Sequence, residues 1–90
     1  MKKRVHLFVN GRVQGVFFRS RTLAMARKIG ATGWIRNLKD GRVEAVFEGD
    51  EKAIEEMISF CKTGSPEALV KDVEIKWEIY TGEYKTFTII

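Results

Sequence analysis

Cysteine and histidine are almost absent from this sequence, and so are long apolar runs. Cys61 is the only cysteine, which excludes an internal disulfide. Because the chain also has only one histidine, we expect no metal and no cofactor. No apolar run approaches the roughly 20 residues that a membrane-spanning helix needs. The apolar segment Val5–Val9 is too short for a signal peptide and is broken by His6. We therefore expect a cytoplasmic protein without a membrane partner.

Side-chain amides are also scarce. Gln14 is the only glutamine, and Asn10 and Asn37 are the only asparagines. A shortage of thermolabile residues beside many lysines, arginines and glutamates is compatible with a source that lives at high temperature. Two of the three amides, Gln14 and Asn37, lie in the segments that carry the functional hypothesis below.

The composition is that of a globular protein with an anionic partner. Hydrophobic residues make up 44% of the chain and charged residues 31%, and 90 residues suffice for one modest core, so we expect one domain over residues 1–90. The formal net charge of +4 favours nucleic acid, a membrane surface or a phosphorylated small molecule. Charge alone does not choose among these three partners, and a mild excess of lysine and arginine is often only a solubility feature.

Apolar periodicity predicts alternating strands and helices. Period-two alternation predicts strands at Arg4–Asn10, Trp34–Leu38, Arg42–Glu48 and Val73–Ile79, with a short trailing strand or edge extension in Tyr84–Ile90. Helical spacing is seen in two stripes, Thr22, Met25, Ala26 and Ile29, then Ile54, Met57, Ile58 and Cys61. Gly30 is expected to end the first helix, Asp50 can cap the second, and Gly64-Ser65-Pro66 is expected to end it. Lys39-Asp40-Gly41 predicts a tight hairpin.

The order βαββαβ with a trailing strand predicts an α+β, ferredoxin-like sandwich. In this arrangement two helices cover one face of a mostly antiparallel sheet. Because this fold carries many unrelated functions, the function has to be inferred from particular residues.

The segment Gly11–Arg19 (GRVQGVFFR) has the composition of an anion-binding loop. Its glycines allow the backbone to turn so that successive N–H groups converge. The helix that follows offers unpaired N–H groups and the positive end of its dipole. Arg19 adds a planar set of donors that suits a phosphate, although a solvated arginine at a helix start would look the same.

A second segment could complete a hydrolytic site. Asn37 ends the second predicted strand, and the split βαβ topology can bring it near the first loop. A neutral amide there could orient a water toward a bound phosphoryl group. Asn37 could also be a turn former ahead of Asp40-Gly41.

These two segments resemble the signatures of the acylphosphatase family. Gly11–Arg19 resembles the first, and Gly33–Asn37 (GWIRN), followed by Gly41-Arg42-Val43 and Gly49, resembles the second at the family's spacing. Gly64-Ser65-Pro66 also stands where the family has this tripeptide. Ile35 departs from the pattern, which usually has a smaller residue.

The resemblance implies a metal-independent acylphosphatase that hydrolyses the carboxyl–phosphate bond of acyl phosphates. It implies that backbone N–H groups bind the phosphoryl oxygens, with Arg19 as a clamp and Asn37 holding the attacking water. The residues whose N–H groups would bind are Gln14, Gly15, Val16, Phe17 and Phe18. The expected partners are a small acyl phosphate and inorganic phosphate, the expected state is a monomer, and neither nucleic acid nor membrane is expected.

Other residues have structural interpretations. At least one of Phe17 and Phe18 is expected in the core, and the side chain of Gln14 is expected to be replaceable because its role is assigned to its backbone. His6 is expected to be a sheet residue and Cys61 a buried, inert thiol, and the tryptophans are expected to serve packing.

Three rival functions share parts of this pattern. An RNA-recognition module has the same element order, but Arg42–Glu48 offers one aromatic and two glutamates where such a module needs stacking aromatics. A domain that senses a small anion without catalysis would not need both Arg19 and Asn37. An acylphosphatase-like domain of a larger maturation enzyme that handles carbamoyl phosphate is disfavoured by the short chain.

Overall fold

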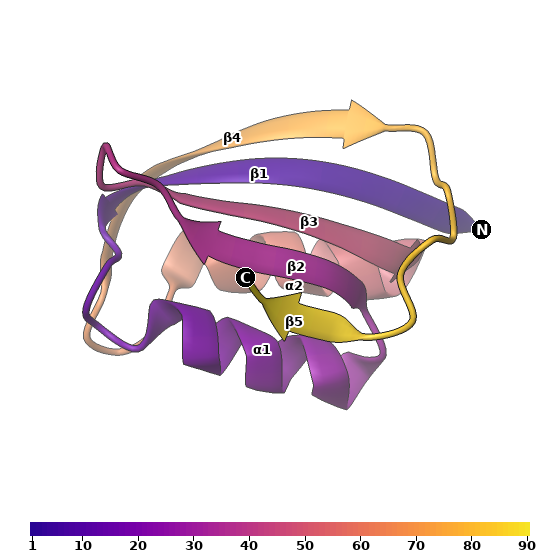
Figure 1. Cartoon of the computed structure of the whole chain (residues 1–90), viewed down its shortest axis with the longest axis horizontal. Coiled ribbons are helices and arrows are strands. Elements are labelled where there is room, and N and C mark those ends of the chain that lie inside the picture. Colours follow the sequence, from indigo (N-terminus) through magenta and orange to yellow (C-terminus); the bar gives the residue numbers. More distant parts are fainter.

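The computed structural model describes residues 1–90 and confirms the predicted α+β, ferredoxin-like fold. The elements are β1 (Lys2–Arg12), α1 (Phe18–Ile29), β2 (Thr32–Asn37), β3 (Val43–Asp50), α2 (Glu51–Thr63), β4 (Leu69–Glu78) and β5 (Phe87–Ile89). Both helices lie on one side of the sheet, and its other face carries no helix (Figure 1).

The five strands form one mixed sheet in the order β4-β1-β3-β2-β5. The contacts β1–β3, β1–β4 and β2–β3 are antiparallel, as predicted. The trailing strand β5 pairs in parallel with β2, from Gly33 opposite Phe87 to Ile35 opposite Ile89. Gly33 is required at this position, because a Cβ there would lie 1.9 Å from the carbonyl oxygen of Val46. The end of the chain therefore extends the sheet beyond β2.

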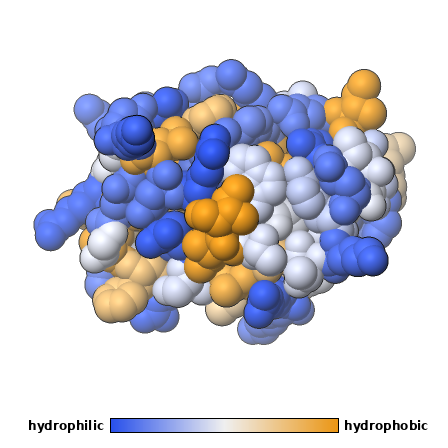
Figure 2. Space-filling model, viewed as in Figure 1, coloured by the Kyte–Doolittle hydropathy of each residue, from blue (hydrophilic) through white to orange (hydrophobic).

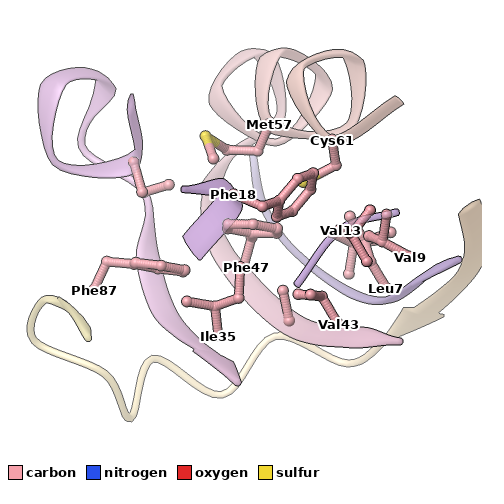
Figure 3. Packing of buried hydrophobic residues seen from close by; sticks show 14 of the residues in the cluster. Leu7, Val9, Val13, Phe18, Ile35, Val43, Phe47, Met57, Cys61 and Phe87 are labelled. Atoms are coloured by element: carbon pink, nitrogen blue, oxygen red, sulfur yellow. The ribbon is translucent and has the colours of Figure 1, made fainter. Parts of the chain in front are cut away.

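The core lies between the helices and the covered face of the sheet (Figure 3). Its large side chains include Phe18 at the start of α1 and Phe47 and Phe87 from the sheet. The rings of Phe47 and Phe87 stack with their centroids 5.1 Å apart. The predicted stripe of α2 supplies Met57 and Cys61, which are fully buried. Burial raises the pKa of the Cys61 thiol to about 12, so this cysteine is a buried thiol, as expected.

One local expectation was met only in part, and another was wrong. Asp50 stands at the N-terminal cap of α2, but its side chain makes no capping hydrogen bond and lies 3.3 Å from the Lys2 ammonium instead. Ile79 lies beyond the end of β4 and is 88% exposed, although alternation placed it on the apolar face of a strand. The reason is that β4 is an edge strand in which no residue is fully buried, so period-two alternation there does not mean burial.

No helix of the structure is long and apolar enough to cross a membrane. Hydrophilic residues dominate the surface seen in Figure 2, and apolar residues gather near the middle of that face.

Candidate active site

The loop that joins β1 to α1 has a backbone shaped to collect N–H groups. Gly15 has φ of +72° and Phe17 has φ of +63°, both in the left-handed region. Glycine adopts this conformation freely, whereas in a phenylalanine it costs on the order of 1–3 kcal/mol. Left-handed residues alternating with others form a concave nest of N–H groups that suits an anion. A Cβ on Gly15 would meet no atom within 4 Å, so the loop is open to solvent there.

The N–H groups of residues 14–20 donate to no acceptor within the protein. The helix α1 that contains the last three begins without a side-chain cap, and its first turn has no acidic residue. The first N–H groups of a helix carry partial positive charge from the helix dipole. The loop and the helix start therefore form one uncompensated, electropositive set of donors.

Arg19 lies at this set of donors and pairs with no protein acceptor. Arg4, Arg36 and Arg42 each pair with a carboxylate, but the partly buried Arg19 makes no ion pair or hydrogen bond within the chain. A hollow of about 300 Å³ opens here. Its lining residues are Val13, Gly15, Phe17, Phe18, Arg19, Ser20 and Ile89. We call this hollow the cradle.

Two side chains hold the loop in place from opposite sides. Gln14 donates from Nε2 to the carbonyl oxygens of Leu38 (2.7 Å) and Arg42 (3.0 Å), both in the β2–β3 hairpin. Ser65, in the α2–β4 connection, donates from its buried Oγ to the Val16 carbonyl oxygen at 2.7 Å. These connections all lie at the same end of the molecule (Figure 1, left).

Sequence reasoning missed both of these contacts. The side chain of Gln14 was expected to be replaceable, but its amide joins the loop to the neighbouring hairpin. The only hint of a role for this side chain was that Gln14 is the only glutamine of the chain. Ser65 was noted only within a tripeptide that ends a helix, and nothing in the local pattern indicates a contact 49 residues away.

Asn37 is the last residue of β2, next to the hairpin that Gln14 binds. Its side chain is partly buried, and its Oδ1 is the one buried side-chain oxygen or nitrogen without a hydrogen-bond partner. Leaving a buried acceptor unpaired costs on the order of 1–3 kcal/mol, so such an atom calls for an explanation. Asn37 does not line the cradle itself; it is joined to it through Leu38 and Gln14.

The two phenylalanines of the loop have different surroundings. Phe18 is 1% exposed and anchors the start of α1 in the core, as expected for at least one of the pair. Phe17 is 64% exposed although its side chain is large and apolar. The core therefore explains the position of Phe18 but not that of Phe17.

The histidine and Trp34 lie on the open face of the sheet, away from the cradle. His6 is a sheet residue, as expected, with Nε2 2.6 Å from Glu44 and Nδ1 3.0 Å from Glu78. Trp34 donates from Nε1 to the Tyr84 hydroxyl at 3.1 Å. Burial alone would raise the pKa of Glu44, but hydrogen bonds from His6 and Arg36 outweigh it and lower that pKa. No cluster of three or more histidine, cysteine or acidic side chains that could hold a metal occurs.

Comparisons with known proteins agree along nearly the whole chain. The family model described as Acylphosphatase matches residues 5–89. A curated acylphosphatase of a Roseiflexus species is 52% identical over 87 residues, which cover 97% of this chain and 94% of the relative. One from Pelotomaculum thermopropionicum is 49% identical over 88 residues, covering 98% and 96%. The crystal structure of acylphosphatase from Bacillus subtilis superposes with a TM-score of 0.93 at 36% identity, covering 100% of this chain and 99% of the other.

Proposed function

Since this chain belongs to the acylphosphatase family, and is therefore a hydrolase acting on acid anhydrides, we propose how its residues carry out the reaction. The substrate is a small acyl phosphate, and one product is inorganic phosphate. In our mechanism, a water oxygen forms a bond to phosphorus while the bond between phosphorus and the acyl oxygen breaks. The acyl group leaves as a carboxylate.

The cradle binds the phosphoryl group in the first step. The N–H groups of Gln14, Gly15, Val16, Phe17 and Phe18 donate to its nonbridging oxygens. Arg19 donates from the start of α1 to the same oxygens. It forms no ion pair with a carboxylate of the chain. A loose phosphoryl-transfer transition state spreads negative charge over these oxygens, so preorganised donors lower its energy.

Asn37 orients the attacking water in the second step. Its Oδ1 accepts a hydrogen bond from the water, which fixes the direction of the water's lone pair toward phosphorus. An acyl phosphate has a carboxylate as its leaving group, so positioning contributes more than a strong base would. None of the seven residues that line the cradle carries a carboxylate or an imidazole.

The unpaired Oδ1 of Asn37 is the observation that carries this proposal. A fold that pairs its other buried polar side chains leaves one acceptor free, beside a loop whose N–H groups and arginine are also free. Unpaired groups of three kinds on a loop and on the strand end joined to it by Gln14 are expected where a ligand and a water complete the hydrogen bonds.

Hydrolysis in ¹⁸O-labelled water tests where the water attacks. Benzoyl phosphate is hydrolysed with a single turnover per enzyme, and the products are analysed by mass spectrometry. We expect the label in inorganic phosphate and none in benzoate. Label in benzoate would mean that water attacks the carbonyl carbon, which would contradict the proposed mechanism.

Two further measurements on the same preparation define the site. Inorganic phosphate should inhibit competitively, because it uses the same donors as the phosphoryl group. A chelator should leave the turnover number unchanged; inactivation that added metal reverses would contradict the proposal that protein groups alone stabilise the transition state.

A further inference from the structure

A second hollow, of about 510 Å³, adjoins the cradle along the outer side of the helices. Its apolar wall consists of Phe17 at the end of the loop, Ala24 and Met25 from α1, and Phe60 from α2. We call this hollow the helix groove. Its volume is that of a small-molecule site, and four of its eight lining residues are apolar; Ser20, Arg21, Lys28 and Glu67 complete the lining.

The cradle and the helix groove share part of their lining. Phe17 and Ser20 border both hollows, so the groove begins where the cradle ends. Phe17 is also the residue whose conformation and exposure the core leaves unexplained, with φ of +63° and 64% of its surface exposed. Backbone strain and an exposed aromatic ring at one position are typical of a residue held for a ligand.

The direction of the reaction also favours this groove. Attacking and leaving oxygens lie roughly in line through phosphorus. The water side is the side of Asn37, to which the beginning of the loop is joined by Gln14. The end of the loop, at Phe17, borders the groove. In the mechanism proposed above, the leaving acyl group lies on the side of phosphorus opposite Asn37, which is the side of Phe17 and the groove.

We propose that the helix groove binds the acyl group of the substrate and gives the enzyme a preference for aromatic and larger apolar acyl phosphates over acetyl phosphate. This inference rests on the mechanism proposed above for the cradle. Contact of the acyl group with Phe17, Met25 and Phe60 removes apolar surface from water, which favours a benzoyl group over a methyl group. The small acetyl group does not extend far enough to gain from the groove.

The test compares kcat/KM for benzoyl phosphate and acetyl phosphate in the full chain. Phe60→Ala removes one wall of the groove from α2, which contributes nothing to the cradle. Ala24→Gln fills the groove from an exposed position of α1, so it serves if Phe60→Ala fails to fold. Trp77→Ala is the matched control, since it removes a 56% exposed aromatic ring from β4 at the edge of the sheet.

In both groove variants we expect the ratio of benzoyl to acetyl kcat/KM to fall by about tenfold, the size of effect that a few methylene groups have in an apolar pocket. The value for acetyl phosphate should stay within about twofold, since an acetyl group makes little use of the groove. An unchanged ratio, or an equal loss for both substrates, would overturn the inference. Either result leaves the position of the ¹⁸O label untouched, so failure of the groove and failure of the mechanism are distinguishable.

Discussion

The open face of the sheet and the cradle differ in whether their polar groups have partners within the chain. On the open face, Arg4 donates to Glu48 at 3.1 Å and to Glu78 at 2.8 Å. His6 lies between Glu44 and Glu78 on the same face. Nearly every charge there has a partner of opposite sign from another strand or from the loop before β5.

At the cradle the comparable groups have no partner. Arg19, the N–H groups of residues 14–20 and the Oδ1 of Asn37 make no hydrogen bond within the chain. Groups that are paired within the chain are not free to bind a ligand, whereas donors without a protein partner bond water and can exchange that water for a ligand. The difference indicates that the open face serves stability and that the cradle serves binding and turnover.

Arg19→Ala should have the largest effect on activity. We expect the turnover number to fall by roughly three to five orders of magnitude, the scale for loss of an arginine that stabilises a transferred phosphoryl group. The free energy of unfolding should stay within about 0.5 kcal/mol, because no partner is lost. Arg36→Ala is the matched control on the open face: it breaks the 2.6 Å pair with Glu44 and should leave turnover nearly unchanged. Equal loss of turnover in the two variants would break the comparison.

Asn37→Ala should have the next largest effect. Loss of one oriented group at the transition state typically costs about two to three orders of magnitude in turnover. The dissociation constant for inorganic phosphate should stay within about threefold, because the cradle donors are unchanged. The free energy of unfolding should not decrease, since an unpaired buried acceptor is removed. Near-normal turnover, measured beside Asn10→Ala as the control, would contradict the water-positioning role.

Glu48→Ala should lower stability and leave activity unchanged, the opposite of what is expected for Arg19→Ala. The buried carboxylate of Glu48 accepts hydrogen bonds from Arg4, from the N–H and hydroxyl of Thr81, and from the N–H of Gly82. We expect the free energy of unfolding, measured with urea, to fall by about 2–3 kcal/mol. Turnover at a temperature where the variant is folded should match that of the parent. A large loss of turnover with unchanged stability would mean that the open face takes part in catalysis.

The carboxylates of the open face should also make stability depend on pH, and this effect should be smaller than that of Glu48→Ala. For Glu44 and Glu48, hydrogen bonds outweigh the effect of burial, and for Glu78 those from Arg4 and His6 are the largest influence; the pKa of each lies below its ordinary value of 4.5. A lowered pKa in the folded state contributes stability that is present above the unfolded pKa. Thermal unfolding temperature should therefore fall as pH drops below about 4.5, and less steeply in Glu48→Gln than in the parent. An identical slope in the two proteins would exclude this carboxylate as a contributor.

Much of the fold could be predicted from local patterns, since helix and strand periodicity reflect which side of an element faces the core. The stripes that contain Ala26 and Met57 pack as predicted. Alternation failed at Ile79 because a sequence pattern does not show which strand will lie at the edge of the sheet or where that strand ends. The parallel partner of β5 was also beyond local reasoning, because it depends on which sheet edge is free.

The candidate site was predictable where one loop or one strand end carries the chemistry. Arg19 and Asn37 could be identified as candidates from residue type and spacing, and their roles stay predictions. The contacts of Gln14 and Ser65, and the helix groove at Phe60, join segments far apart in the chain. Such contacts are set by tertiary packing, which no single segment of sequence contains.

Titration of the ¹⁵N-labelled protein with inorganic phosphate tests the central claim most directly. The claim is that the unpaired N–H groups of the cradle bind the phosphoryl group while the paired groups of the open face do not. We predict that amide chemical shifts of residues 14–19 change together and saturate with one dissociation constant, while those of Glu44 and Glu78 stay fixed, and that Arg19→Ala weakens the binding. Shifts that center on the open face, or cradle amides that do not respond to phosphate, would contradict the account.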